Sequence, residues 1–187
     1  MQTIHGPNGK VVNVTKTGRL ETYAVTVSLE HDTNKRNGEA YSWYFTDDAD
    51  ANDDCIFYLK NNDDRDLVLE GMNLYVTSDA EVYIKLGGVG TTNSSATAVV
   101  GCNMNAGSGN VADVTALHDG DIQAGATFSS STECLRYKYT DGTSYDTHDI
   151  NYPMDIIIPK NSVFSIWCGT AGVVIQCTIF GFFDDSE

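Results

Sequence analysis

The acidic segment that ends at Asp54 comes nearest, in residue types and spacing, to a metal site. Aspartates recur there at Asp48, Asp50 and Asp54, and Ca²⁺ is bound by several oxygen ligands at spaced positions of this kind. The EF-hand pattern fails, because Asp53 stands where that loop needs glycine and Leu59 where it needs glutamate. A looser Ca²⁺ site made by the three aspartates is one hypothesis. A solvated loop between two strands is the other.

Motifs for catalysis are missing from the rest of the sequence. His5, His31, His118 and His148 are not paired at the spacing of zinc ligands. There is no Gly-x-Ser-x-Gly nucleophile elbow and no Gly-x-x-x-x-Gly-Lys phosphate loop. The chain has 26 acidic residues, but their spacing selects no pair for glycoside hydrolysis. We therefore expect a protein that is not an enzyme and has no cofactor, with Ca²⁺ as the one exception to test.

Aromatic side chains on strand faces are candidates for binding sugars or another protein. Alternation places Trp43 with neighbouring aromatic residues on a face typical of a core. Four tyrosines fall on the opposite faces of their strands: Tyr44, Tyr58, Tyr75 and Tyr83. They can be ordinary half-exposed strand residues, because tyrosine favours sheets. They can also line a subunit interface, where tyrosine is enriched, and we predict the interface.

Strands must position all of these residues, because apolar and polar residues alternate with a period of two over much of the chain. Turn residues cut these runs at strand length. The segments 31–38 and 47–54 are charged and predict loops, and Gly71 inside a run predicts a bulge. The predicted strands cover residues 20–29, 40–45, 55–60, 67–77, 81–86, 133–139 and three runs between 154 and 183.

The number of strands and the lack of a 3.6-residue apolar stripe predict an all-β protein. We predict one antiparallel β-sandwich of jelly-roll type over residues 20–187, preceded by a polar N-terminal arm at residues 1–19. The Gly-, Ser- and Asn-rich stretch 87–131 predicts short strands within an ordered excursion. Both faces of the run 173–180 are largely apolar. That run is therefore either a central strand or a strand whose second face a neighbouring subunit covers.

A formal charge of −15 limits the partners of the chain. It repels nucleic acid and anionic membranes, which both require a basic surface. The start of the sequence lacks the apolar region of a secretory signal, and no apolar run has the length of a membrane span. The charge itself is explained by solubility, by cation binding, by adaptation to high salt or by docking onto a basic partner.

The five cysteines predict reduced thiols, three of them buried. None lies in a Cys-x-x-Cys pair, and Cys55, Cys168 and Cys177 lie within apolar strand patterns. Free cysteine behaves as a small buried hydrophobic residue. A Cys168–Cys177 bridge across a hairpin is the alternative.

Several segments resemble small structural proteins of tailed bacteriophages, in order along most of the chain. The segments that carry the resemblance are residues 9–25, 31–45, 57–71 and 158–162. It implies a virion component made in the host cytoplasm: a head decoration or cement protein, or a part of the tail or neck. It also implies a homo-oligomer, often a trimer, that binds the major capsid protein or other virion proteins. A receptor- or carbohydrate-binding module of a tail, neck or fibre is the alternative.

Overall fold

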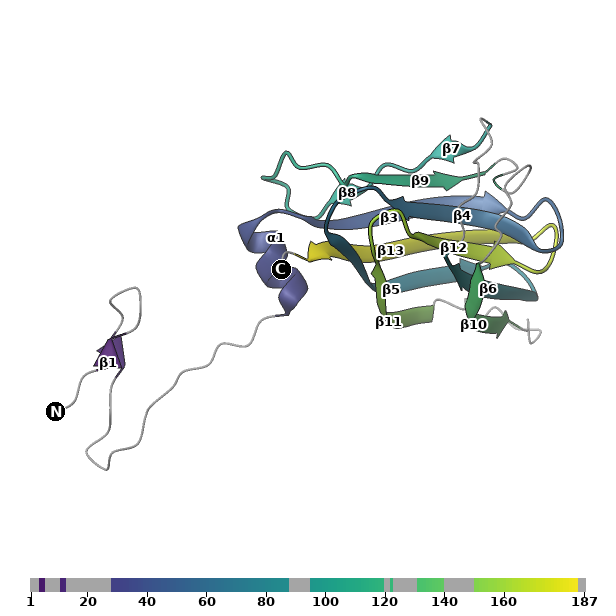
Figure 1. Cartoon of the computed structure of the whole chain (residues 1–187). Coiled ribbons are helices and arrows are strands. Elements are labelled where there is room, and N and C mark those ends of the chain that lie inside the picture. The colour runs from purple at the N-terminus through teal and green to yellow at the C-terminus, as the bar shows by residue number, and fades with distance from the viewer. Residues whose placement is uncertain are drawn as a thin grey trace, which may run out of the picture.

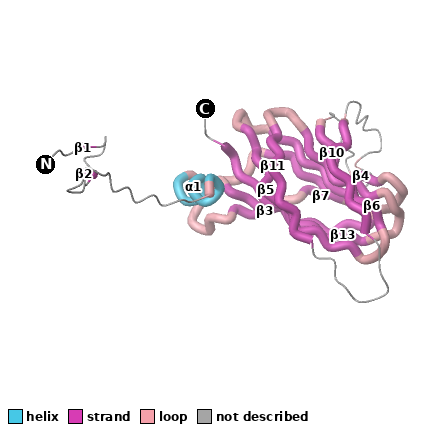
Figure 2. The backbone as a smooth tube through the Cα atoms, turned by 90° about the horizontal axis from the view of Figure 1, so that it is seen from below, coloured by secondary structure: helices cyan, strands magenta, loops and turns pink. Residues whose placement is uncertain are grey.

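Two antiparallel β-sheets face each other across a shared core in this computed structural model (Figure 1). The structure describes residues 28–87, 95–119, 122, 131–139 and 150–184, and two short strands near the N-terminus. The view in Figure 2 shows the sheets beside the one short helix of the described residues. The prediction of an all-β antiparallel sandwich is confirmed.

The larger sheet has six strands in the order β10-β6-β12-β4-β9-β7. β4, β6 and β12 form its middle, and β7 and β10 are its edges. The strands are β4 (Asp54–Asn61), β6 (Ala80–Leu86), β7 (Thr97–Ala98), β9 (Val114–His118), β10 (Thr132–Tyr139) and β12 (Val163–Cys168).

The smaller sheet has five strands in the order β11-β5-β13-β3-β8. Its strands are β3 (Ala40–Asp48), β5 (Asp66–Val76), β8 (Cys102–Asn103), β11 (Ile150–Ile158) and β13 (Val174–Asp184). β13 pairs with β5 on one side and with β3 on the other. The interpretation of the C-terminal run as a central strand is therefore confirmed.

The long strands pair as a nested set. β3 pairs with β13, β4 with β12, β5 with β11 and β6 with β10, all antiparallel. The first and third pairs lie in the five-stranded sheet, and the second and fourth lie in the six-stranded sheet. The short strands β7, β8 and β9 belong to the segment between β6 and β10. β9 and β7 extend the six-stranded sheet beyond β4, and β8 extends the five-stranded sheet beyond β3.

The core lies between the sheets and follows the period-two pattern. Tyr41, Trp43 and Phe45 of β3 point into it and are at most 2% exposed. Phe45 stacks on Phe57 of the opposite sheet, with ring centroids 4.7 Å apart. Burial of one large apolar side chain contributes about 1.5–3 kcal/mol, so these aromatic pairs are a main reason that the sheets stay together.

A helix, α1 (Leu29–Arg36), replaces the predicted loop at residues 31–38. The prediction was wrong because the helix has only one buried residue and therefore no apolar stripe in its sequence. It is stabilised instead by contacts at its two ends. The Ser28 side chain accepts a hydrogen bond from the His31 N–H at 3.1 Å, which satisfies one unpaired donor of the first turn. Asp32 and Arg36 form an i,i+4 ion pair at 2.7 Å. Gly38 then turns the chain with φ of +65°.

The described part of the excursion, residues 95–119, holds the C-terminal end of α1. The side-chain amide of Asn105 donates to the Asn34 carbonyl at 2.9 Å, and that of Asn110 donates to the Asn37 carbonyl at 2.8 Å. Asn103 donates to the Gly38 carbonyl at 2.7 Å. These amides satisfy carbonyls that a helix end leaves unpaired. The predicted short strands are present here as β7, β8 and β9.

Several predicted features lie partly or wholly outside the described residues. Strands β1 (Ile4–His5) and β2 (Val11–Val12) pair within the predicted arm. The rest of the arm, the boundary at residue 20 and residues 20–27 of the strand predicted at 20–29 are not described, and neither are residues 88–94 and 123–130. The described end of that predicted strand is wrong, because Ser28 caps α1 and Leu29 is its first residue. Within the described part of the chain, no helix has the length and apolar character that a membrane crossing requires.

The five thiols are free. Cys55, Cys168 and Cys177 are buried, as their strand patterns predict, and Cys102 and Cys134 are exposed. The alternative of a Cys168–Cys177 bridge is therefore wrong.

Candidate functional site

The outer face of the six-stranded sheet is covered within the chain. A second apolar cluster lies there, separate from the main core: Cys55, Tyr58, Tyr83, Ile122, Val163 and Trp167. Tyr58 is 2% exposed and Tyr83 is 3% exposed. Of the four tyrosines predicted for a subunit interface, these two are already covered by their own chain.

Aromatic and cationic side chains alternate around Tyr83. Its ring stacks on Trp167, with centroids 6.4 Å apart. Lys85 Nζ lies 3.6 Å from the centroid of Trp167, and the Arg136 guanidinium lies 4.8 Å from that of Tyr83. The Tyr83 hydroxyl donates to Asp53. Cations on both rings, with a hydrogen bond at the hydroxyl, hold this cluster in place.

The outer face of the five-stranded sheet carries an uncharged surface. Gln176 lies between Thr46 and Tyr75 in the register, and Thr178 lies between Tyr44 and Asn73. Tyr44 is 59% exposed, and its hydroxyl is 2.8 Å from the Thr46 hydroxyl. We call this surface the uncharged face: Ser42, Tyr44, Thr46, Asn73, Tyr75, Gln176, Thr178 and Phe180. Tyr44 and Tyr75 are the predicted interface residues that a partner can reach.

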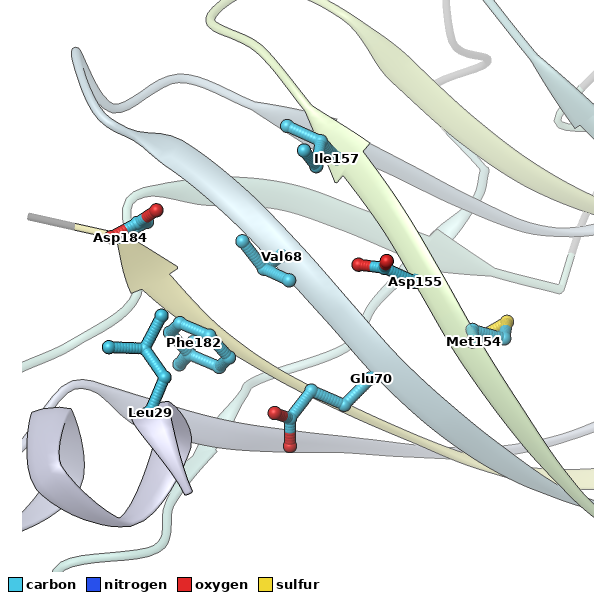
Figure 3. Close-up of a pocket in the computed structure, with 8 residues that line it drawn as sticks. All are labelled: Leu29, Val68, Glu70, Met154, Asp155, Ile157, Phe182 and Asp184. Carbon is cyan, nitrogen blue, oxygen red and sulfur yellow. The ribbon is translucent and has the colours of Figure 1, made fainter. Parts of the chain in front are cut away.

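A groove of about 520 Å³ adjoins the uncharged face beside α1 (Figure 3). Phe182 and Val68 lie side by side on the sheet, and Leu29 of α1 lies next to Phe182 (Figure 3). Leu29 is 53% exposed and Ile157 is 56% exposed, so the groove keeps apolar surface in water. The residues that line it are Leu29, Val68, Glu70, Met154, Asp155, Ile157, Phe182 and Asp184.

A β-bulge in β5 places Glu70 at the groove. Leu69 and Gly71 pair with the consecutive residues Gly181 and Phe180 of β13, so Glu70 is the extra residue. The pairing with β11 shifts at the same point. A bulge re-aims side chains and changes which residues face the core. The bulge predicted from Gly71 is therefore present.

Glycine is required at the bulge because the backbones approach closely. A Cβ atom at Gly181 would lie 2.6 Å from the Val68 carbonyl oxygen, and one at Gly71 would lie 3.0 Å from the Tyr152 carbonyl oxygen. Real Cβ atoms are rarely this close to backbone. The two glycines thus fix the position of the bulge, and with it the position of the Glu70 carboxyl group.

The groove concentrates negative charge. The pKa of Glu70 is raised to about 7, by burial above all and also by the neighbouring carboxyl groups of Glu30 and Asp155. Nearby like charges disfavour the ionised form of a carboxyl group. The groove can therefore attract a cationic group beside its apolar floor.

The acidic loop does not assemble the predicted Ca²⁺ ligands. Asp48 and Asp50 are exposed, and Asp54 is buried at the start of β4. Asp54 accepts a hydrogen bond from the Asp50 N–H at 2.9 Å, which is the arrangement of a turn. Among the described residues, no group of three or more His, Cys, Asp or Glu side chains is placed to hold a metal ion.

Asp47, which precedes this loop, is buried and was not singled out from the sequence. It is 7% exposed and accepts a hydrogen bond from the Asp119 N–H at 2.8 Å. Burial raises the pKa of its carboxyl group to about 7. The alternation of β3 places Asp47 on the core side with Phe45, and that pattern was the one signal in the sequence for its burial.

The groove was also missed at the sequence level. Its residues come from α1, β5, β11 and β13, which are far apart in the chain. The bulge at Gly71 was the single local signal. Comparisons with protein-family models, with curated proteins and with solved structures found no match to this chain.

Proposed function

We propose that this chain is a structural protein of a tailed-bacteriophage virion: a capsid decoration or cement protein that binds the head surface as a homo-oligomer, with a trimer favoured. It acts by surface contact and not by catalysis. Its partners are the major capsid protein or other virion proteins, and neither nucleic acid nor a membrane. It is made in the host cytoplasm and resides in the virion. The resemblance of segments such as 31–45 and 57–71 to structural phage proteins motivates this proposal.

The proposal includes a jelly-roll fold. In a jelly roll, one long antiparallel ribbon is rolled up so that alternate strand pairs fall into two sheets. The nested pairing of β3, β4, β5 and β6 with β13, β12, β11 and β10 has this order and supports the assignment. Jelly rolls are frequent in viral capsid proteins.

The observation that carries the proposal is the difference between the two outer faces. The six-stranded sheet is covered by its own cluster, whereas the five-stranded sheet has an uncharged face with Tyr44 59% exposed. In a chain of charge −15, a sheet face built of uncharged polar and aromatic residues differs from the acidic surface around it, and tyrosine is enriched at protein interfaces. A protein that works by docking needs one such face and no catalytic centre.

Mass spectrometry of purified particles of the phage that encodes the chain tests the proposal. The protein should be present at a copy number that matches a symmetric site on the head. Cryo-EM of the head then separates decoration from a tail or neck position. Absence of the protein from particles would refute the proposal.

Charge placed on the uncharged face tests the docking surface. Tyr44→Lys with Gln176→Lys should reduce binding to isolated heads, because both residues lie outward on β3 and β13. Leu135→Lys is the matched control, since Leu135 is 37% exposed on the other sheet. Equal binding by both variants would show that the contact lies elsewhere.

A carbohydrate- or receptor-binding module of a tail, neck or fibre is the second candidate. Tyr44 supports it, because an exposed ring beside the Thr46 hydroxyl can stack on a sugar while the hydroxyls donate hydrogen bonds. A glycan array distinguishes the two functions. Binding that Tyr44→Ala abolishes would favour the module, and an array without binding would leave the virion-surface proposal as the better one.

A further inference from the structure

The groove beside α1 has the chemistry of a peptide-binding site. Its floor is apolar, with Leu29 and Ile157 more than half exposed. Its rim carries Glu70, Asp155 and Asp184, and none of its eight lining residues is cationic. A suitable occupant therefore combines apolar side chains with lysine or arginine. A purely apolar segment would remove water from these carboxyl groups without offering them a cationic group, which is unfavourable.

The chain itself contains a segment of this composition. Residues 10–20 read Lys-Val-Val-Asn-Val-Thr-Lys-Thr-Gly-Arg-Leu, with cations at Lys10, Lys16 and Arg19. Residues 1–27 hold three of the 11 cationic residues of the chain and, in Glu21, only one of the 26 acidic residues. The strongly acidic chain thus has a basic beginning. We call residues 10–20 the basic segment.

We propose that the groove beside α1 binds the basic segment of a second copy of this chain. Lysine and arginine of the segment pair with Glu70, Asp155 and Asp184, and its valines cover Leu29 and Ile157. Residues 21–27 connect the segment to Ser28 and can span up to about 23 Å at roughly 3.3 Å per residue, enough to reach a neighbour. Each copy offers one segment and one groove, so the exchange can close into a ring.

This inference deepens the proposed function, because it rests on the chain forming a homo-oligomer. It assigns the contact between copies to the groove and leaves the uncharged face for the particle surface. The contact is electrostatic in part, so it should weaken with salt.

Reversal of charge on each side tests the proposal with the full-length protein. The segment variant is Lys10→Glu, Lys16→Glu and Arg19→Glu. The groove variant is Asp155→Lys and Asp184→Lys. Each variant alone should dissociate to monomers in sedimentation velocity, with an association constant roughly tenfold or more below that of the unaltered protein. Lys35→Glu and Asp50→Lys, which are exposed outside the groove, are the controls and should assemble normally. Circular dichroism confirms that each variant is folded.

An equimolar mixture of the two variants is the decisive measurement. Exchange between copies predicts that the two variants associate with each other, because an acidic segment can then meet a basic groove and a basic segment an acidic groove. In a ring with an odd number of copies, one contact still joins two copies of the same variant, so the expected result is association above the monomer and not a complete ring. A segment that binds its own groove predicts no recovery. Carbodiimide cross-linking of mixed ¹⁴N- and ¹⁵N-labelled protein should likewise join Lys16 to Asp155 across isotopes.

A mixture that stays monomeric, cross-links confined to one isotope, or an unaltered protein that is monomeric would each overturn the inference. Failure here is distinct from failure of the proposed function. Presence of the protein in virions is measured on particles, and the exchange of segments is measured on the purified chain.

Discussion

The carboxyl group of Glu70, in the bulge of β5, neighbours the carboxyl group of Glu30 on α1, and burial together with this neighbour raises the pKa of Glu70. This contact joins the helix to the sheet, and it is free of charge repulsion only while Glu70 is protonated. It exists because the bulge turns Glu70 outward at the point where α1 begins beside β13. The attachment of α1 to the sandwich is therefore sensitive to pH.

Glu70→Gln should flatten the dependence of stability on pH. The folded-state pKa of Glu70 is raised from 4.5 to about 7, so its contribution is fully present below about 4.5 and is lost as the pH rises through about 7. The unaltered protein should therefore lose unfolding free energy between pH 5 and pH 8. Urea denaturation at several pH values measures this slope. Glu133→Gln is the control, because the pKa of Glu133 is lowered by Arg136 and lies below this window. An unchanged slope in Glu70→Gln would contradict the raised pKa of Glu70.

Asp47→Asn should stabilise the protein at pH 8 and leave it nearly unchanged at pH 4. Burial raises the pKa of Asp47 from 3.8 to about 7. The ionised carboxylate therefore opposes folding above pH 7, and this effect disappears as the pH falls. Asparagine still accepts the hydrogen bond from the Asp119 N–H. Thermal unfolding at the two pH values checks the expectation, and an equal shift at both would rule it out.

Gly181→Ala should destabilise the sandwich by about 1–3 kcal/mol, as overpacking does in a close-packed interior. The added Cβ would lie 2.6 Å from the Val68 carbonyl oxygen, so β5 and β13 must move apart at the bulge. Gly109→Ala is the control, because a Cβ there meets nothing within 4 Å. Chemical denaturation of both variants gives the comparison. Equal stability would mean that the bulge relaxes without cost.

Truncation after Thr170 should abolish folding. It removes β13, which is the central strand of the five-stranded sheet and supplies Ile175, Cys177 and Ile179 to the core. Its loss leaves β5 and β3 as exposed edges that promote aggregation. Soluble expression with a cooperative thermal transition would show that this expectation is wrong.

Much of the fold could be predicted from the sequence because burial alternates along single strands. The alternation of Tyr41, Trp43 and Phe45 identified the core face of β3 directly. Helix α1 escaped prediction because its stability comes from Ser28, the Asp32–Arg36 ion pair and the amides of residues 103–110, and not from an apolar stripe.

Sites that depend on tertiary structure could not be predicted in the same way. Tyr58 and Tyr83 face outward from their sheet, yet Trp167 and Ile122 help to cover them. The groove brings Leu29, Glu70 and Asp155 together from three separate elements. The spacing of residues along the sequence does not reveal such contacts between distant elements.

The nested pairing also determines when this protein can finish folding. Tyr41 of β3 lies opposite Gly181 of β13, near the two ends of the described sandwich. During synthesis, β3 therefore cannot pair with β13 until almost the whole sandwich has left the ribosome. Contacts between such distant residues make folding slow. Until then, the apolar face of β3 lacks the neighbouring strand that completes its sheet.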